Sequence, residues 1–344
     1  MSGRSPETVP RVSILMPVYN ALPFLREAVD SMLTQTMGDF ELVAIDDGST
    51  DGTEPVLQQY AEADARVIHL RIERGGIVAA LNAGLSRCRA EVVARMDADD
   101  RSLPDRLSRQ LAFLEQHPEV VVVGCAQRRM DEAGRPICRR PSVLGHDSIE
   151  AQMLRGQAGV LHHPTAMMRL AAVREAGGYR EQYRHAEDLD LFLRMAEIGQ
   201  LANLPDELYE ARMHLGSVTR TESQRHLREL KRQIVAETRQ RRGLGGGQVE
   251  LDLPERDYDE AAHRLKWAWR ALGDLHPRTA RHHAWKVARS RPTSARAWGI
   301  LAGSMLPTSV MGKLRDRRRQ KLSPAASRQG GVGPVNLGAG AAGS

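Results

Sequence analysis

The sequence predicts an α/β fold in which a mostly parallel sheet is flanked by helices and followed by a C-terminal helical appendage. Two observations carry this prediction. Short, continuously apolar segments alternate with amphipathic segments through roughly the first 125 residues, which is typical of buried parallel strands and the helices that cover them. Acidic residues follow several of the apolar segments, at the strand ends where open parallel sheets bind their ligands.

The expected strands are short apolar runs, and the expected helices repeat apolar residues three or four positions apart. Strands are predicted over residues 12–16, 40–45, 67–70, 92–96 and 120–123. Helices are predicted over residues 23–33, 54–63 and 104–115, and another follows Gly75-Gly76 and ends at Leu85. After Gly124 the pattern is less regular, with a helix over 189–195 and short strands near 201–204 and 208–212. This part is expected to complete the same domain.

The remaining chain predicts a small second unit. We expect a disordered N-terminus over residues 1–10, a catalytic domain over 11–221, a polar helix and glycine-rich linker over 222–247, a helical appendage with a basic end over 248–322 and a disordered tail over 323–344. Three short helices are predicted over 258–271, 279–290 and 295–305, and they carry all four tryptophans of the chain. These tryptophans are expected to form a small helical core, and an acceptor or partner surface is the alternative.

Composition restricts the class of protein. The 344 residues are 41% hydrophobic and can bury a sizeable core. Residues 1–10 are polar and no run of about 18 apolar residues occurs, so neither a signal peptide nor a membrane span is expected. Three cysteines without paired spacing predict neither disulfides nor a zinc site. The expected location is therefore the cytoplasm.

The net charge of +6 is concentrated near the C-terminus, where residues 313–321 are strongly basic, whereas the first half is mixed in sign. A basic tail of this kind indicates attraction to phosphates at a membrane surface or in RNA, or to nothing specific, and no nucleic acid partner is expected. A solvated tail is one interpretation. The other is peripheral attachment to an anionic membrane surface on the inner face, because the largely apolar residues 298–311 precede the basic run.

Polar and acidic residues follow three of the expected strands. The segments are Pro17-Val18-Tyr19-Asn20, Asp46-Asp47-Gly48-Ser49 and Asp97-Ala98-Asp99-Asp100. The second, taken alone, also suits an ordinary turn with a helix cap. Gathered carboxylates repel one another unless a cation or a donor-rich ligand is present, which indicates a metal ion or a nucleoside. Mg²⁺ or Mn²⁺ bridging two phosphate oxygens would explain the last cluster.

Four motifs in this order resemble the signature of family 2 glycosyltransferases. They are Val12-Ser13-Ile14-Leu15-Met16-Pro17-Val18-Tyr19-Asn20, Asp46-Asp47-Gly48-Ser49-Thr50-Asp51-Gly52, Ala94-Arg95-Met96-Asp97-Ala98-Asp99-Asp100 and Ala186-Glu187-Asp188. The resemblance covers about residues 11–221. It implies a glycosyltransferase-A-type fold, an inverting reaction, and a nucleoside-diphosphate sugar, such as a UDP-sugar, as the donor.

The resemblance also implies roles on the donor side. Pro17 and Tyr19 would border the nucleoside, and Asp47 would bind the base, with Asp46 as the alternative partner. Asp97 and Asp99 would form the Asp-x-Asp motif that contacts the ribose and the metal bound to the diphosphate.

The sequence leaves two assignments at the expected metal site undecided. The neighbouring Asp100 leaves open which of Asp99 and Asp100 is the direct ligand. His214, in a segment that resembles the end of the family's catalytic domain, would complete the metal shell or contact the diphosphate, and a purely structural role is the alternative.

On the acceptor side, inverting transfer needs one base to deprotonate the acceptor hydroxyl. Asp188 would be that base at the start of an apolar helix, although an acidic pair such as Glu187-Asp188 also complements a helix dipole. Glu187 and His163 are expected on the acceptor side. If His162 and His163 lie on a strand, only one of them faces the site. Many members of the family carry a basic residue one turn before the position of Asn82, and this chain does not. Which groups offset the diphosphate charge is therefore open, with Arg74 and Arg95 as the candidates.

The predicted function is sugar transfer from the nucleotide donor to a glycan or lipid-linked acceptor, in cell-surface polysaccharide biosynthesis. A sugar nucleotidyltransferase is one alternative, but such enzymes carry a glycine-rich phosphate loop with a basic residue after the first strand, and the segment 17–23 lacks both. A non-catalytic nucleotide-sugar-binding module is the other.

Overall fold

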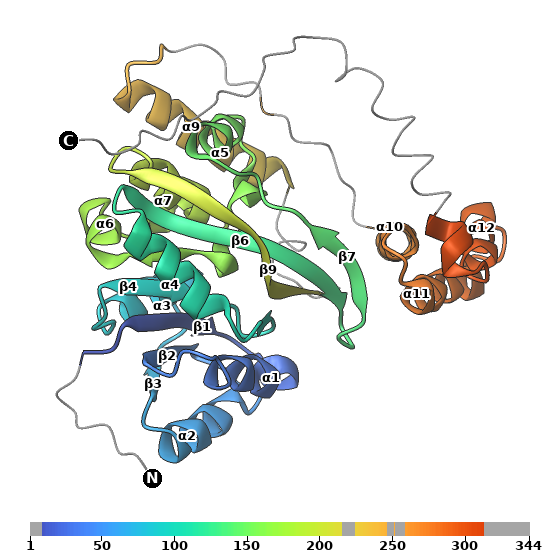
Figure 1. Ribbon diagram of the computed structural model, residues 1–344, viewed down its shortest axis with the longest axis horizontal. Helices are drawn as coiled ribbons and strands as arrows, with labels where there is room; N and C mark the ends of the chain where they lie inside the picture. The colour runs from blue at the N-terminus through green and yellow to red at the C-terminus, as the bar shows by residue number, and fades with distance from the viewer. Residues whose placement is uncertain (1–8, 215–223, 246–250, 252–258, 313–344) are drawn as a thin grey trace, which may run out of the picture.

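A nine-stranded sheet with helices on both faces forms the centre of the protein (Figure 1). The computed structural model describes residues 9–214, 224–245, 251 and 259–312. The strand order is β3-β2-β1-β4-β8-β6-β9-β5, and β7 pairs with β6. The strands are β1 (Val12–Val18), β2 (Phe40–Asp47), β3 (Val67–Ile72), β4 (Val92–Arg95), β5 (Arg101–Ser102), β6 (Val120–Asp131), β7 (Pro136–Arg140), β8 (Met167–Arg169) and β9 (Gln200–Met213).

Helices cover the sheet and form the separate group on the right of Figure 1. They are α1 (Leu22–Leu33), α2 (Thr53–Ala63), α3 (Ile77–Leu85), α4 (Arg106–Gln116), α5 (His146–Met153), α6 (Leu170–Glu175), α7 (Glu187–Met195), α9 (Gln224–Arg241), α10 (Glu260–Gly273), α11 (Pro277–Ser290) and α12 (Ala295–Gly303). Among the described residues, no helix is both long and apolar enough to cross a membrane. The predictions for residues 1–8, 215–223, 246–250, 252–258 and 313–344 lie outside the described residues.

The first four strands confirm the predicted parallel arrangement. β1 runs parallel to β2 and β4, and β2 runs parallel to β3. Successive side chains of a strand point to opposite faces: Ile14 and Met16 enter one hydrophobic cluster, whereas Leu15 enters the other. Burial on both faces explains the continuous apolar runs, and the parallel direction brings the carboxyl ends of these strands to one edge.

The second half of the sheet is mixed. β8 is antiparallel to both β4 and β6, whereas β9 is parallel to β6. The prediction of two short strands near 201–204 and 208–212 is wrong, because β9 is one strand of 14 residues. β9 pairs with β6 through several register shifts, and such bulges place an extra residue out of step. The bulges therefore break the sequence periodicity without breaking the strand.

The C-terminal helices α10, α11 and α12 confirm the three predicted helices, but the prediction that the tryptophans form their core is wrong for three of the four. Trp267 is 2% exposed, whereas Trp269, Trp285 and Trp298 are 42%, 49% and 48% exposed. The core consists largely of alanines, among them Ala268, Ala271, Ala280, Ala284, Ala288 and Ala297. Such small side chains let the helices approach closely, which leaves little room between them for large rings.

This helical group is attached to the strands β6 and β7. His283 lies 2.9 Å from Asp131, between its Nε2 and the carboxylate Oδ2, and both side chains are almost fully buried. The backbone N–H of Arg139 donates to the Asp274 carboxylate at 2.6 Å. The buried polar pair fixes the group in one position, because either member would be costly to bury alone.

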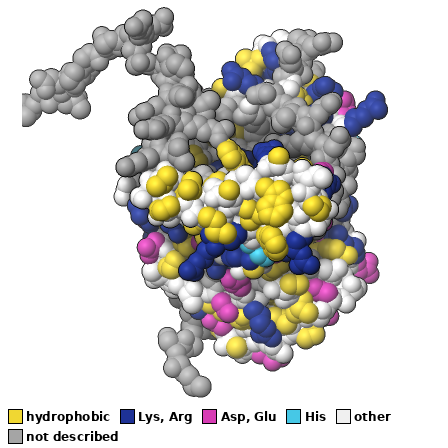
Figure 2. Space-filling model, turned by 90° about the vertical axis from the view of Figure 1, so that its right-hand side faces the viewer, with side chains coloured by type: hydrophobic (Ala, Val, Ile, Leu, Met, Phe, Trp, Pro, Cys, Tyr) yellow, Lys and Arg dark blue, Asp and Glu magenta, His cyan; other side chains and the backbone are white. Residues whose placement is uncertain are grey.

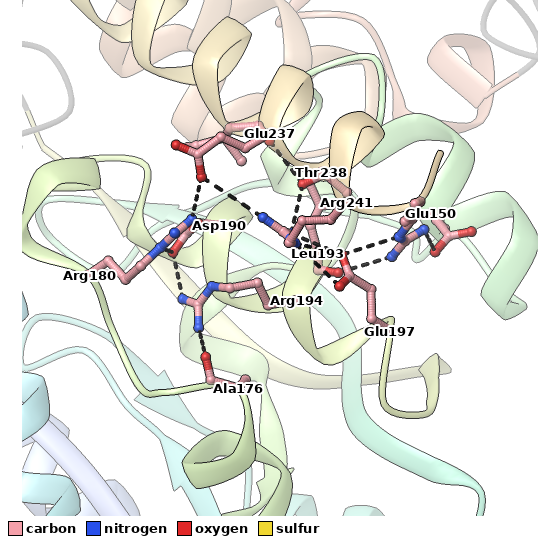
Figure 3. Close-up of polar contacts among 12 residues, drawn as sticks. Glu150, Ala176, Arg180, Asp190, Leu193, Arg194, Glu197, Glu237, Thr238 and Arg241 are labelled. Carbon is pink, nitrogen blue, oxygen red and sulfur yellow. Dashed lines mark hydrogen bonds and ion pairs between the residues drawn. The ribbon is translucent and has the colours of Figure 1, made fainter. Parts of the chain in front are cut away.

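Helix α9 is clamped to helix α7 by a cluster of ion pairs (Figure 3). The Asp190 carboxylate, 1% exposed, accepts from Arg180 and from Arg194. Arg180 also donates to Glu237 on α9 at 3.0 Å. The apolar side chains of α9 join the same core as those of α7, and they are Leu230, Ile234 and Val235. The middle of α7, at Asp190, is therefore held from outside by α9 through Arg180.

We expect Asp190→Ala to lower the free energy of unfolding by about 3–5 kcal/mol, because the change leaves the largely buried guanidinium of Arg194 without its counter-charge. Urea denaturation followed by circular dichroism measures this loss. Glu229→Ala on the outer side of α9 is the matched control: its side chain is 55% exposed and faces Arg232 at 3.5 Å, so a change within about 0.5 kcal/mol is expected. Equal losses in the two variants would contradict the proposed clamp.

Candidate active site

The carboxyl ends of β1, β2 and β4 meet at one edge of the sheet. Val18 pairs with Asp46, and Leu15 pairs with Arg95, so the loops that follow these strands are neighbours. This edge holds the three polar segments identified in the sequence, and Glu187 and Asp188, at the N-terminal end of α7, interact electrostatically with Arg95. The structure therefore brings the predicted donor-side and acceptor-side acids together around one residue.

The turn after β2 is built by Asp46. Its Oδ1 accepts the backbone N–H of Ser49 at 2.9 Å, and its Oδ2 accepts from Arg71 at 2.8 Å. Asp46 is fully buried. Both of its oxygens are thus committed to holding the turn, as the turn-and-cap interpretation of this segment expects.

Asp47 faces the glycines at the start of α3 and forms an ion pair with Arg74. The backbone N–H groups of Gly75 and Gly76 donate to its carboxylate at 2.7 and 2.9 Å. The guanidinium carbon of Arg74 lies 3.5 Å from the centre of the Tyr19 ring, a stacking distance for a cation on an aromatic face. The exposed Tyr19 ring and the Arg74 guanidinium stacked on it form a flat surface suited to a nucleobase.

The loop after β1 is locked to the loop after β2. Asn20, which adopts a positive φ of 47°, accepts the backbone N–H of Thr50 at 2.9 Å, and its own N–H donates to the Ser49 hydroxyl at 3.0 Å. Asp51 accepts the backbone N–H of Leu22 at 3.0 Å. These residues of the motif therefore position the loops rather than offering free groups to a ligand.

The acids after β4 form a compact cluster. Asp97, Asp99 and Asp100 each present a carboxylate oxygen, and these oxygens lie within 4.8 Å of one another. His214 Nε2 lies 2.9 Å from Asp99 Oδ2. Asp100 is buried and accepts the backbone N–H of Arg212 at 2.6 Å. Asp99 and His214 are thus the more accessible groups, whereas Asp100 ties the cluster to β9.

Negative charge in this cluster is not fully offset by the protein. Burial raises the pKa of Asp97, although Arg95 opposes this effect. The pKa of Asp100 is raised well above its usual value by burial and by the charges of Asp99 and Asp97. A divalent cation would relieve this repulsion, and hard cations such as Mg²⁺ and Mn²⁺ prefer carboxylate oxygens. The donor set therefore fits the predicted metal.

The acids at the start of α7 lie in a second buried group. Glu187 is 6% exposed, and its Oε2 has no hydrogen-bond partner among the described residues. Burial and the neighbouring Asp188 raise the pKa of Glu187 to about 7. Burial also raises the pKa of Asp188, whose Oδ1 accepts the Leu189 N–H at 2.7 Å, while Lys231 and Arg95 act in the opposite direction. Complementing the helix dipole accounts for the Leu189 contact but not for a buried, unpaired carboxylate oxygen.

His163 lies deeper than a ligand-facing side chain would. It belongs to a 3-10 turn (His163–Thr165) and not to a strand, so the expectation of two histidines on opposite faces of a strand is wrong. Its Nε2 lies 2.8 Å from the hydroxyl of Tyr179. Burial and the charge of Arg95 hold the pKa of His163 well below its usual value, so the ring is neutral at physiological pH and supports Tyr179 beside Glu187 and Asp188.

Arg95, at the end of β4, stands between the two acidic groups. Its side chain is almost fully buried and forms an ion pair with Asp97. Burial opposes its charge, but Asp97 and two tyrosines outweigh this effect and raise its pKa. The same guanidinium acts on Glu187 and on Asp188. Arg95 therefore counters negative charge in both acidic groups, at Asp97 and at Glu187-Asp188.

Comparisons with known proteins agree with this arrangement. The model of the family "Glycosyl transferase family 2" matches residues 13–177. The putative glycosyltransferase EpsE of Bacillus subtilis (strain 168) is 38% identical over 208 residues, which cover 59% of this chain and 73% of that protein. The amylovoran biosynthesis glycosyltransferase AmsE of Erwinia amylovora is 34% identical over 204 residues, which cover 58% of this chain and 75% of that protein.

Solved structures show a similar fold. TarS (residues 1–349) of S. aureus in complex with UDP-GlcNAc superposes with a TM-score of 0.53 at 19% identity, over 90% of this chain and 92% of that chain. The mannosyltransferase PcManGT of Pyrobaculum calidifontis in complex with GDP-Man and Mn²⁺ superposes with a TM-score of 0.50 at 21% identity, over 93% and 85%. At these identities the likeness concerns the fold alone, and it confirms the predicted glycosyltransferase-A-type architecture.

The fold and the sequence relatives define a glycosyltransferase. The chain belongs to glycosyl transferase family 2, as its motifs predicted. Family membership favours this function over the nucleotidyltransferase alternative.

The sequence did not predict the residues of β9 that hold the acidic cluster in place. Arg212 donates through its backbone to Asp100 and through its Nε to the carbonyl oxygen of Asp99 at 2.8 Å. The Tyr209 hydroxyl accepts the backbone N–H of Asp97 at 3.2 Å. Both lie on β9, more than 100 residues from their partners. β9 also carries Asp206, Glu207 and Glu210, so its sequence contained no signal that set Arg212 apart and none that named its partner.

We expect Glu187→Gln to stabilise the protein more at pH 8 than at pH 5. The folded-state pKa of about 7 exceeds the usual value of 4.5, so between these values the folded protein binds more protons than the unfolded chain, and wild-type stability falls as pH rises. Because glutamine does not ionise, the Glu187→Gln variant does not lose this stability as pH rises. Thermal unfolding at both pH values measures the difference. Glu181→Gln, at a side chain that is 60% exposed, should give the same small effect at both pH values; a pH-independent effect of Glu187→Gln would contradict the assignment.

Proposed function

We propose that this protein is an inverting, metal-dependent glycosyltransferase that moves a sugar from a nucleoside-diphosphate-sugar donor to a hydroxyl group of a glycan or lipid-linked acceptor. The observation that carries the proposal is the pair of acidic groups, Asp97 to Asp100 and Glu187-Asp188, around the buried Arg95. One group suits a metal-bound diphosphate and the other suits a general base, as single displacement requires.

The donor is placed beside Tyr19 in this proposal. The ring of Tyr19 stacks on the nucleobase, and Arg74 moves from Asp47 to the donor. The Asp47 carboxylate then accepts a hydrogen bond from the nucleobase. Pro17 borders the nucleoside and Asp97 contacts the ribose. The similar structures described above were solved with UDP-GlcNAc and with GDP-Man, which supports a nucleotide sugar as the donor class.

Asp99 and His214 would hold Mg²⁺ or Mn²⁺, and we assign Asp99 rather than Asp100 as the direct ligand. Asp100 is buried and already accepts the Arg212 N–H, whereas Asp99 presents its carboxylate beside His214. When bound, such a cation neutralises the negative charge that develops on the departing diphosphate. The mannosyltransferase of similar fold was solved with Mn²⁺, which is consistent with this choice.

Asp188 is the proposed base. It takes the proton of the acceptor hydroxyl while the oxygen attacks the anomeric carbon, and the bond from that carbon to the diphosphate oxygen breaks on the opposite face, which inverts the configuration. Lys231 and Arg95 favour the ionised form of Asp188, and α9 holds α7 in place. Glu187 lies beside the acceptor in this proposal. His163 is on the same side and acts indirectly, through its hydrogen bond to the Tyr179 hydroxyl.

The acceptor class and the location are inferred from the relatives. Besides the amylovoran biosynthesis protein, they include a hyaluronan synthase and a chondroitin synthase of Pasteurella multocida, 29% and 28% identical over 206 residues that cover 60% of this chain and 21% of each relative. We therefore place the chain in the assembly of a cell-surface polysaccharide, in the cytoplasm at the inner face of the membrane. In this proposal residues 11–221 are catalytic and the appendage over 248–322 governs location.

We expect Asp188→Asn to lower sugar transfer by at least about 10²- to 10⁴-fold while donor affinity stays nearly unchanged, because the amide cannot accept the acceptor proton. Transfer assays and calorimetric donor titration measure the two quantities. Asp147→Asn is the matched control, since Asp147 is an exposed acid in the first turn of α5 and should leave both unchanged. Unchanged turnover in Asp188→Asn would refute the base assignment, whereas donor binding without any transfer by the wild type would favour a non-catalytic binding module.

We expect a chelator to abolish transfer and Mn²⁺ or Mg²⁺ to restore it, because the acidic cluster after β4 needs a cation to bind a diphosphate. Asp99→Asn should raise the cation concentration needed for half-maximal rate, whereas Asp105→Asn, at an exposed acid nearby, should not. Thermal-shift screening of nucleotide sugars with Mn²⁺ present identifies the donor, since a ligand of the folded state raises Tm. Full activity in chelator would refute the metal role.

A further inference from the structure

The outer face of α11 and α12 carries aromatic and apolar side chains that nothing in the described protein covers. Trp285 and Trp298 are each about half exposed, and their ring centres lie 6.4 Å apart at an interplanar angle of 84°. Met305, Leu306 and Val310 follow and are 67%, 41% and 41% exposed. Figure 2 shows hydrophobic side chains gathered in a band across this face, with Lys and Arg side chains along its edge. We call this surface the tryptophan face.

The helical spacing puts arginines on the same side as the tryptophans. Arg278, Arg281, Trp285 and Arg289 follow one another at steps of three or four residues along α11, and all four are exposed. Residues so spaced share one side of a helix. Within the described part of the chain, neither Arg278 nor Arg289 forms a salt bridge. Their charges are therefore available to a partner.

The charge of this helical group is strongly one-sided. Residues 259–312 contain nine arginines and lysines and three acidic residues, and α11 contains no acid. Residues 297–312 contain no charged residue at all. A tryptophan-bearing apolar surface with a basic border fits the boundary between the headgroups and acyl chains of an anionic membrane, since tryptophan prefers that boundary and arginine binds acidic headgroups.

We propose that the tryptophan face binds the surface of an anionic lipid bilayer, with Trp285 and Trp298 at the level of the headgroups. Pairing with a second copy would set two basic surfaces against each other, and the C-terminal segment 313–321 is itself basic, so neither supplies the opposite charge. Glycan binding fits less well, because the two rings are nearly perpendicular and the neighbouring Met305 and Leu306 offer no groups to sugar hydroxyls. The inference does not depend on the catalytic assignment.

Sedimentation of the full chain with vesicles tests this proposal. We expect binding to phosphatidylcholine vesicles that contain phosphatidylglycerol, weakening at high salt, and much less binding to phosphatidylcholine alone. A blue shift of tryptophan fluorescence on binding should accompany it. The double variant Trp285→Ser/Trp298→Ser should lower partitioning at least about tenfold and remove most of the shift, because it deletes the apolar anchor. Leu144→Ser, at a 51% exposed apolar residue outside this face, is the matched control and should bind like the wild type.

A second variant keeps the test independent of the folding of the tryptophan variant. Arg278→Gln/Arg289→Gln should lower binding to the anionic vesicles about tenfold or more and leave the circular dichroism and the rate of donor hydrolysis unchanged. Three results would overturn the proposal: vesicle binding equal in the wild type and both variants, a concentration-dependent dimer that the tryptophan variant abolishes without any vesicle binding, or a raised KM for a soluble glycan acceptor without a change in vesicle binding. The second result would assign the face to another copy of the chain, and the third to the acceptor.

Discussion

The position of the buried Arg95 is the constraint on which the site depends. Its guanidinium neutralises Asp97, and its backbone carbonyl accepts from Arg106 at 2.7 Å. Arg106 is fully buried, bonds Gln110 at 3.0 Å, and Gln110 donates to the carbonyl oxygens of Val123 and Thr165 at 2.9 and 2.8 Å. A buried polar chain of this kind is stable only when each member finds a partner. The end of β4 is therefore tied to α4, to β6 and to the turn that carries His163.

Sharing one cation between two acidic groups couples them electrically. A charge gained or lost near Asp97 changes the electrostatic interaction of Arg95 with Glu187 and Asp188, because charges inside a protein are screened far less than in water. Binding of a diphosphate with its cation changes the charge near Asp97. In the proposed reaction, the proton affinity of Glu187 and Asp188 would then depend on whether a donor is bound, which would link deprotonation of the acceptor to a filled donor site.

The sequence predicts well those features that local patterns determine. The strands β1 to β4 and the helices between them follow from apolar spacing, and the acids after β2 and β4 follow from the rule that ligands bind at strand ends. The sequence predicts poorly those features that depend on residues far away in the chain. The single long strand β9 depends on pairing with β6, the exposure of Trp285 and Trp298 depends on an alanine core, and the central place of Arg95 depends on the convergence of segments about 90 residues apart in the chain.

The family match ends at residue 177, before the helix that carries Asp188. That helix depends on a later segment of the chain: Leu230, Ile234 and Val235 of α9 share its core, and Glu237 reaches Arg180, which holds the buried Asp190. The proposed base, at the start of a nine-residue helix, would need such support, because a short helix is not rigid by itself. We therefore infer that α9, which lies outside the proposed catalytic residues 11–221, supports the site, and that the connection to the tryptophan face begins only after it.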